Sequence, residues 1–173
     1  MLYFMNRDKL KGVCIMRPTQ IDLHLSLLEA SKQLSTQTIM FHQAIAGHLG
    51  LNITDHKCLD LILSRGRATA GQLAEWTGLT TGAITSVLNR LEKAGYIRRT
   101  KDPNDLRVVY AEPLYSQLHT IKKSFAPLND AMLELYSKYS QEELQTILDY
   151  LILSCQSLRN LTDDLRKPTI ENQ

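Results

Sequence analysis

Two short helical segments joined by a glycine-containing turn, with a hairpin pattern directly behind them, constrain the fold of this chain more than any other feature. Thr69 and Gln72 have the spacing of a capping box, which predicts a helix that begins there and stops at Gly78. Thr80 or Thr81 caps a second helix almost at once. Two helices joined by so short a turn are typical of a helix-turn-helix, although ordinary helical hairpins share this pattern.

The second of these helices, residues 81–94, has a divided surface. Four apolar residues at helical spacing predict its buried stripe: Ile84, Val87, Leu88 and Leu91. The opposite face has no acid and no large apolar residue, and consists of Thr81, Gly82, Thr85, Ser86, Asn89, Arg90 and Lys93. Hydroxyls, amides and cations are the groups that contact base edges and phosphates in a DNA major groove. The alternative interpretation is a solvated polar face.

The segment GYIRRTKDPNDLRVVY, residues 95–110, predicts a hairpin directly after that helix. Strand-forming residues at 96–101 and 107–111 flank a four-residue tip, in which Pro103 occupies the position that type I turns favour. A hairpin attached to the end of a helix-turn-helix is a wing, whose arms can lie against DNA phosphates.

The charges of this hairpin suggest separate roles. Three cations are candidates for phosphate contacts: Arg98, Arg99 and Lys101. Arg107 is a candidate for insertion into the narrow, negative minor groove. Asp105 stands two residues away and can orient the guanidinium of Arg107 by a bidentate contact, unless the two form an ordinary solvated pair.

Composition limits the function classes. The net charge is only +2, but residues 57–107 hold nine Lys and Arg against five Asp and Glu, a net of +4, and the remainder holds eleven against thirteen, a net of −2. No apolar run is long enough for a membrane span, and no signal peptide is evident, so we expect a cytoplasmic protein. Since no phosphate loop, nucleophile–base set or metal motif occurs, we expect neither an enzyme nor a cofactor.

Long helical patterns surround this central region. One runs from about residue 21 to residue 49, and another is capped by Thr54 and ends near Gly66. An a/d seam over 114–135 predicts a helix whose first residue is Pro113 and which Pro127 interrupts and bends.

A second capping box, formed by Ser140 and Glu143, opens a final helix to about residue 166. We expect Cys58 and Cys155 to be small core residues on these apolar faces. Such helices are too long and too apolar for one small domain to cover, which favours a two-fold dimer and a palindromic DNA site.

This order of elements resembles the MarR family of winged-helix transcriptional regulators over residues 21–166. TTGAITSVLNRLEKAGYIRR is similar to the recognition helix of the family and its exit, and DPNDLR is similar to its wing tip. The sequence departs from the pattern at Pro113, at Leu106 in the wing tip, and in its longer N-terminal tail.

The resemblance implies a mostly α fold: a winged helix-turn-helix domain with a two-stranded wing, flanked by N- and C-terminal dimerisation helices. The expected division is a tail (1–18), a dimerisation helix and connection (19–53), the DNA-binding domain (54–112), the C-terminal dimerisation helices (113–166) and a second tail (167–173). It implies a homodimeric repressor of a palindromic operator. A phenolic or lipophilic effector would bind between the dimerisation helices and the winged domain and relieve repression.

Three alternatives remain open. A redox sensor of the same fold would act through Cys14. A metal sensor would use the histidines, although none forms a close pair at ligand spacing: His24, His42, His48, His56 and His119. A winged helix that binds proteins instead of DNA would have no need of Arg107 beside Asp105.

Overall fold

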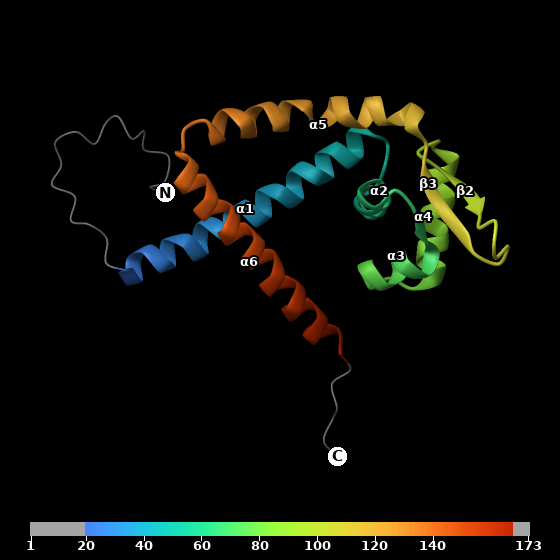
Figure 1. The fold of residues 1–173 in the computed structure, drawn as a ribbon, viewed down its shortest axis with the longest axis horizontal. Coiled ribbons are helices and arrows are strands. Elements are labelled where there is room, and N and C mark those ends of the chain that lie inside the picture. The colour runs from blue at the N-terminus through green and yellow to red at the C-terminus, as the bar shows by residue number, and fades with distance from the viewer. Residues whose placement is uncertain (1–19, 168–173) are drawn as a thin grey trace, which may run out of the picture. The chain divides into compact units, whose positions relative to one another are not determined.

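A computed structural model describes residues 20–167 (Figure 1). The two expected tails lie outside the described residues, except for Lys167. The chain divides between Ala44 and Ile45 into two compact units. No helix among the described residues combines the length and the apolar character that crossing a membrane requires.

The first unit contains most of one long helix, α1 (Gln20–His48), as the sequence pattern predicts. Its large apolar side chains are exposed in the isolated chain: Ile21, Leu23, Leu25, Leu27, Leu28, Leu34, Ile39 and Met40. The last turn of α1 belongs to the second unit and buries Ile45 and Ala46.

The centre of the second unit is a small helical core with an antiparallel sheet. Its elements are α2 (Ile53–Arg65), β1 (Ala68–Thr69), α3 (Ala70–Thr77), α4 (Thr81–Lys93), β2 (Ile97–Lys101) and β3 (Val109–Pro113). The strand order is β1-β3-β2. Each of these elements contributes side chains to the core: Cys58, Leu59, Ile62, Ala68, Leu73, Ile84, Val87, Leu91, Ile97 and Ala111. The apolar stripe predicted for α4 is therefore confirmed, Leu88 included.

β2 and β3 form the expected two-stranded wing, and β1 adds a third strand to the sheet, because Ala68 and Thr69 pair with Ala111 and Tyr110 of β3. Three local expectations need correction. Asn52, and not Thr54, caps α2, since its side chain accepts a hydrogen bond from the Asp55 N–H. Pro113 is the last residue of β3 and is buried, and the following helix begins after an N-cap at Leu114 that makes no side-chain hydrogen bond. The loop of the wing extends over 102–108 instead of four residues.

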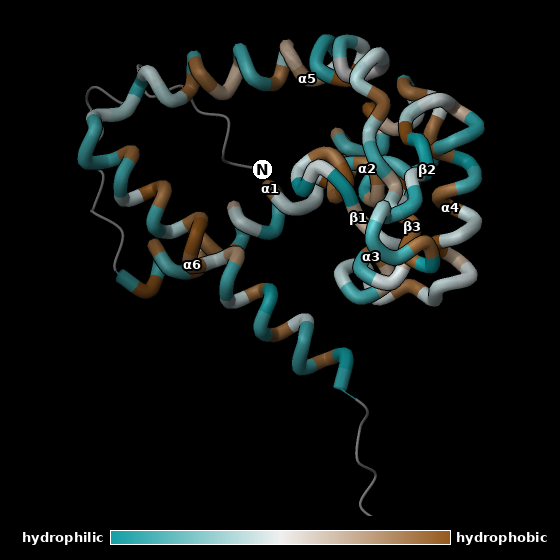
Figure 2. Tube along the Cα trace, turned by 45° about the vertical axis from the view of Figure 1, so that its right-hand side comes forward, coloured by the Kyte–Doolittle hydropathy of each residue, from teal (hydrophilic) through white to brown (hydrophobic). Residues whose placement is uncertain are grey.

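Two long helices end the described chain, α5 (Tyr115–Tyr136) and α6 (Gln141–Arg166). α5 continues through Pro127, so the expected interruption is wrong. The capping box of Ser140 and Glu143 is confirmed. None of the residues of α6 is buried, and brown apolar bands recur along it in Figure 2. Cys58 is a core residue as expected, but Cys155 is exposed, as are most residues of α6.

Candidate nucleic-acid interface

The turn between α3 and α4 is held by local hydrogen bonds. Gly78 adopts a left-handed conformation with φ 74°, which favours glycine, and its N–H donates to the Ala74 carbonyl. Thr80 then caps α4 by accepting from the Ala83 N–H. The capping box of Thr69 and Gln72 at the start of α3 is also present. Residues that the sequence singles out as caps and stops therefore set the angle between the two helices.

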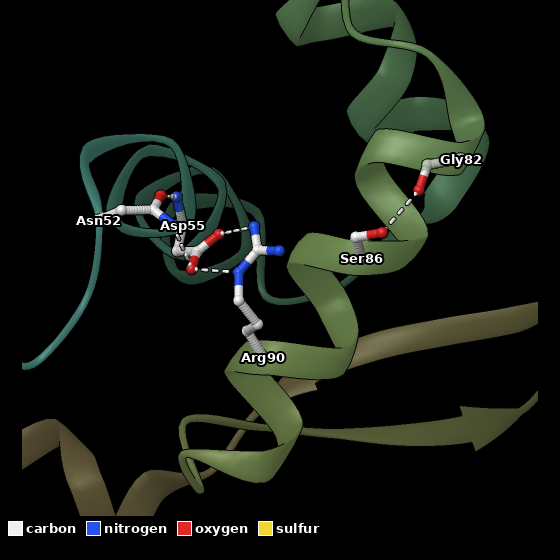
Figure 3. Close-up of polar contacts among 5 residues, drawn as sticks. All are labelled: Asn52, Asp55, Gly82, Ser86 and Arg90. Atoms are coloured by element: carbon white, nitrogen blue, oxygen red, sulfur yellow. Dashed lines mark hydrogen bonds and ion pairs between the residues drawn. The ribbon is translucent and has the colours of Figure 1, made fainter.

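The polar face predicted for α4 is exposed in the structure. The Thr85 hydroxyl donates to the Thr81 carbonyl at 2.9 Å. One residue further on, the Ser86 hydroxyl donates to the Gly82 carbonyl at 3.2 Å, as Figure 3 shows. Each hydroxyl proton is thus used within the helix, and the oxygen lone pairs remain available to an outside partner. Gly82 has no side chain, so nothing projects from this face of α4 at that position.

Arg90 differs from the other residues of this face because its guanidinium is turned toward α2. Its Nε and Nη2 atoms donate to the Asp55 carboxylate at 2.8 and 2.6 Å, and Asn52 Nδ2 donates to the same carboxylate at 2.9 Å (Figure 3). The side chain of Asp55 is 3% exposed, whereas that of Arg90 is 50% exposed. The hydrogen bonds from Arg90 to Asp55 raise the pKa of Arg90. Arg90 therefore joins α4 to α2 through a buried carboxylate, and a contact of its guanidinium with DNA would compete with that pair.

Sequence reasoning misses Asp55, which lies 35 residues from Arg90 and shares no motif with it. Its carboxylate also affects Cys58 one turn later. Burial first, and the negative charge of Asp55 second, raise the pKa of the Cys58 thiol to about 11. Cys58 is consequently a neutral core side chain near neutral pH.

Asn89 is the amide of the polar face, and its partner comes from the wing. Arg99 Nη2 donates to Asn89 Oδ1 at 2.7 Å. Arg99 is held from the other side by Glu92, whose carboxylate lies 3.2 Å from Nη1 and accepts the Arg99 backbone N–H at 3.2 Å. The last exposed turn of α4 and the first part of β2 thereby form one polar cluster.

The other two cations of β2 are more exposed than Arg99. Arg98 lies opposite Glu112 of β3 and pairs with it at 3.1 Å, mostly exposed to solvent. Lys101, at the end of β2, is exposed. Lys101 is accessible to an anionic partner because it is exposed. Arg98 is accessible too, since an exposed ion pair contributes at most about 1 kcal/mol and its carboxylate can be exchanged for another anion.

The tip of the wing is organised by its two aspartates. Asp102 Oδ1 accepts the N–H groups of Asn104 and Asp105, and the Asp102 N–H donates to the Val108 carbonyl. Asp105 accepts two side-chain hydrogen bonds from Arg107, at 3.0 and 2.9 Å, and the backbone N–H of Arg107 as well. The bidentate contact expected between Asp105 and Arg107 is present.

These contacts lower the pKa of the Asp105 carboxyl, chiefly through the Arg107 side chain, and raise the pKa of Arg107. The side chain of Arg107 nevertheless remains 91% exposed. Leu106 beside it is also exposed. The tip therefore presents one oriented cation to the outside.

A family model described as the MarR family matches residues 51–109, from two residues before α2 to the first residue of β3. The HTH-type transcriptional regulator YcgE of Bacillus subtilis is 42% identical over 135 residues, which cover 78% of this chain and 88% of YcgE. The chain belongs to the MarR family. It is accordingly a DNA-binding transcriptional regulator and not an enzyme, and the resemblance stated from its sequence is confirmed.

Solved structures of MarR regulators share the fold. The regulator Tm0710 of Thermotoga maritima is 22% identical with a TM-score of 0.58, over 80% of this chain and 98% of Tm0710. A MarR mutant from E. coli complexed with operator DNA is 20% identical with a TM-score of 0.52, over 80% of this chain and 99% of MarR. The mostly α winged-helix architecture is thus confirmed.

Two basic residues of this MarR-family chain that sequence reasoning left unassigned lie over aromatic rings. Arg65 lies 3.8 Å over the Trp76 ring, and Arg67 lies 4.1 Å over the Tyr110 ring.

The metal-sensor and redox-sensor alternatives concern histidines and cysteines. His56 is buried and stacks on Phe125. Among the described residues, no three His, Cys, Asp or Glu side chains gather as a metal site would require. Cys14 lies outside the described residues.

Proposed function

We propose that the protein is a cytoplasmic homodimeric repressor that binds a palindromic operator and is released by a small-molecule effector. The observation that carries this proposal is the exposed polar face of α4 lying next to a wing whose tip holds an oriented, exposed Arg107. A helix and an adjoining β-hairpin are the elements that enter the major and the minor groove in winged-helix recognition.

Each candidate residue has a role in this proposal. Base edges and nearby phosphates would be contacted by the face of α4: Thr81, Gly82, Thr85, Ser86 and Asn89. Phosphates would be contacted by the wing: Arg98, Arg99 and Lys101. Arg107 would enter the minor groove with Asp105 orienting it, and Arg90 would act through Asp55 by setting the position of α4.

The homodimer is supported by the apolar surface that the chain leaves uncovered. α6 exposes large apolar residues along its whole length: Leu148, Tyr150, Leu151, Ile152, Leu153, Leu158, Leu161 and Leu165. Residues 20–44 of α1 expose a comparable number. So many exposed large apolar side chains are uncommon on a soluble monomer, and a second copy of the chain would bury them.

The effector is supported by a recess in the second unit. It measures about 670 Å³, within the range typical of small-molecule sites, and lies between the last turn of α1 and residues 119–127 of α5. Ile45 and Pro127 contribute apolar surface, and His48, His119 and Lys123 contribute donors suited to a phenolic oxygen. A ligand there would act only by favouring one arrangement of the DNA-binding elements over another.

The test combines light scattering with selection of bound DNA from a random pool. We expect a dimer and a palindromic consensus with a fixed half-site spacing. Binding of that consensus should weaken with salt, since each phosphate contact releases counterions. Arg107→Ala should weaken binding with unchanged circular dichroism, and Lys122→Ala on the exposed surface of α5 is the matched control. A monomer, or a pool without a consensus, contradicts the proposal.

A further inference from the structure

The amide of Asn89 has only one possible orientation next to Arg99. A guanidinium carries hydrogen-bond donors and no acceptor, so the atom of Asn89 that faces Arg99 Nη2 at 2.7 Å must be the oxygen. The Nδ2 group, with its two protons, is then the part of the side chain left for DNA. Turning the amide over would place its protons against the guanidinium and lose a charge-assisted hydrogen bond.

Arg99 is itself held in place before any DNA is present. Glu92 on α4 binds both its side chain and its backbone N–H, each at 3.2 Å. Pairing of β2 with β3 fixes the backbone of Arg99 opposite Ala111, which is buried. The side chain is only 30% exposed. The orientation of Asn89 is therefore a property of the folded protein.

This orientation has a consequence for base recognition. An Asn side chain recognises adenine by a bidentate contact that needs both its oxygen and its nitrogen. One lone pair of the Asn89 oxygen is taken by Arg99, and a second donor such as the adenine N6 amino group would have to approach that oxygen beside the cationic guanidinium. The Nδ2 protons are therefore the favoured contact of Asn89, and guanine is the base that presents two acceptors, O6 and N7, in the major groove. We infer that Arg99 is a positioning residue that makes Asn89 contact DNA through its Nδ2 donors and so selects guanine over adenine at one position of each half-site. This inference rests on the proposed operator binding.

The test measures the ratio of affinities for guanine and adenine at the position that Asn89 contacts. That position is found first, as the one where Asn89→Ala loses discrimination between bases. At this position the wild-type protein should prefer guanine by at least about fivefold, the lower end of what a good base contact provides. Arg99→Met keeps the apolar stem but removes the donors, and it should reverse the ratio in favour of adenine. Arg99→Lys retains a donor and should keep part of the guanine preference.

The ratio separates positioning from a simple phosphate contact, because losing a phosphate contact weakens binding to all sequences equally. Arg98→Met, the neighbouring arginine that pairs with Glu112, is the matched control and should leave the ratio unchanged. A wild-type preference for adenine, an unchanged ratio in Arg99→Met, or a position-independent effect of Asn89→Ala would each overturn the inference while leaving operator binding intact. If the wild-type protein selects no sequence at all, the proposed function fails and the inference fails with it.

Discussion

The ion pair between Asp55 and Arg90 should be energetically asymmetric, although removing either residue breaks the same contact. The side chain of Asp55 is 3% exposed and that of Arg90 is 50% exposed. Arg90→Leu leaves a buried carboxylate with one remaining side-chain partner, the amide of Asn52. Asp55→Leu leaves a guanidinium that water can reach.

The expected magnitudes follow from this difference. Removing one partner of a buried ion pair costs about 3–5 kcal/mol, and the Asn52 hydrogen bond to Asp55 places Arg90→Leu near about 3 kcal/mol. Asp55→Leu should lose only the net value of the hydrogen bonds, about 1–2 kcal/mol. Combining both substitutions removes the stranded charge, so the double variant should be more stable than Arg90→Leu alone.

Urea denaturation at one protein concentration measures these free energies of unfolding, because the stability of a dimer depends on its concentration. The loss of about 3 kcal/mol expected for Arg90→Leu corresponds to a fall in Tm of roughly 6–12 °C for a chain of this size. The reasoning is refuted if Arg90→Leu is no less stable than Asp55→Leu, or if adding Asp55→Leu to Arg90→Leu destabilises the protein further.

Three further outcomes are expected. In carbon NMR the Asp105 carboxyl should titrate below its ordinary pKa, and in Arg107→Ala its pKa should return toward the ordinary value, because the ion pair lowers it. The contribution of that pair to folding stability is present above the ordinary pKa and is lost as the pH falls through the lowered pKa. At pH 8 the thiol of Cys58, with a pKa of about 11, should react with iodoacetamide much more slowly in the folded protein than in urea, as mass spectrometry would show; equal rates would contradict its burial. If the proposed dimer forms through α6, Leu161→Glu should convert it to monomers in light scattering and weaken operator binding, whereas Gln156→Glu on the same helix should do neither. A dimeric Leu161→Glu protein would place the interface elsewhere.

Features that depend on neighbouring residues are the ones that the sequence predicts well. The capping box at Thr69, the buried stripe of α4 and the contact between Asp105 and Arg107 all join residues within four positions of each other, or repeat at helical spacing. Local hydrogen bonding and amphipathic periodicity suffice to specify them. The family resemblance then supplies the arrangement of these elements.

Features that join distant residues are the ones that were missed. β1 consists of only two residues, and Thr69 among them also caps α3, so no strand pattern is visible. Pro113 resembles a first helical residue but ends β3, because the strand needs its position opposite Ile97. The partner of Arg90 lies in the first turn of α2, and that of Arg98 lies across the sheet. Only the tertiary fold brings these side chains together.

The acidic partners that the sequence does not reveal change how the basic excess of residues 57–107 should be interpreted. Each arginine assigned to the interface has a carboxylate within 3.2 Å, and Asp55 and Glu112, the partners of Arg90 and Arg98, lie outside the segment 57–107 whose net charge is +4. Exposed pairs such as those of Arg98 and Arg107 can exchange carboxylate for phosphate at little cost, since they contribute at most about 1 kcal/mol. Leaving the buried carboxylate of Asp55 without its arginine would destabilise the protein more than breaking an exposed pair does. Non-specific attraction to DNA should therefore come from the wing and the exposed lysines, and Arg90 should affect binding through the position of α4.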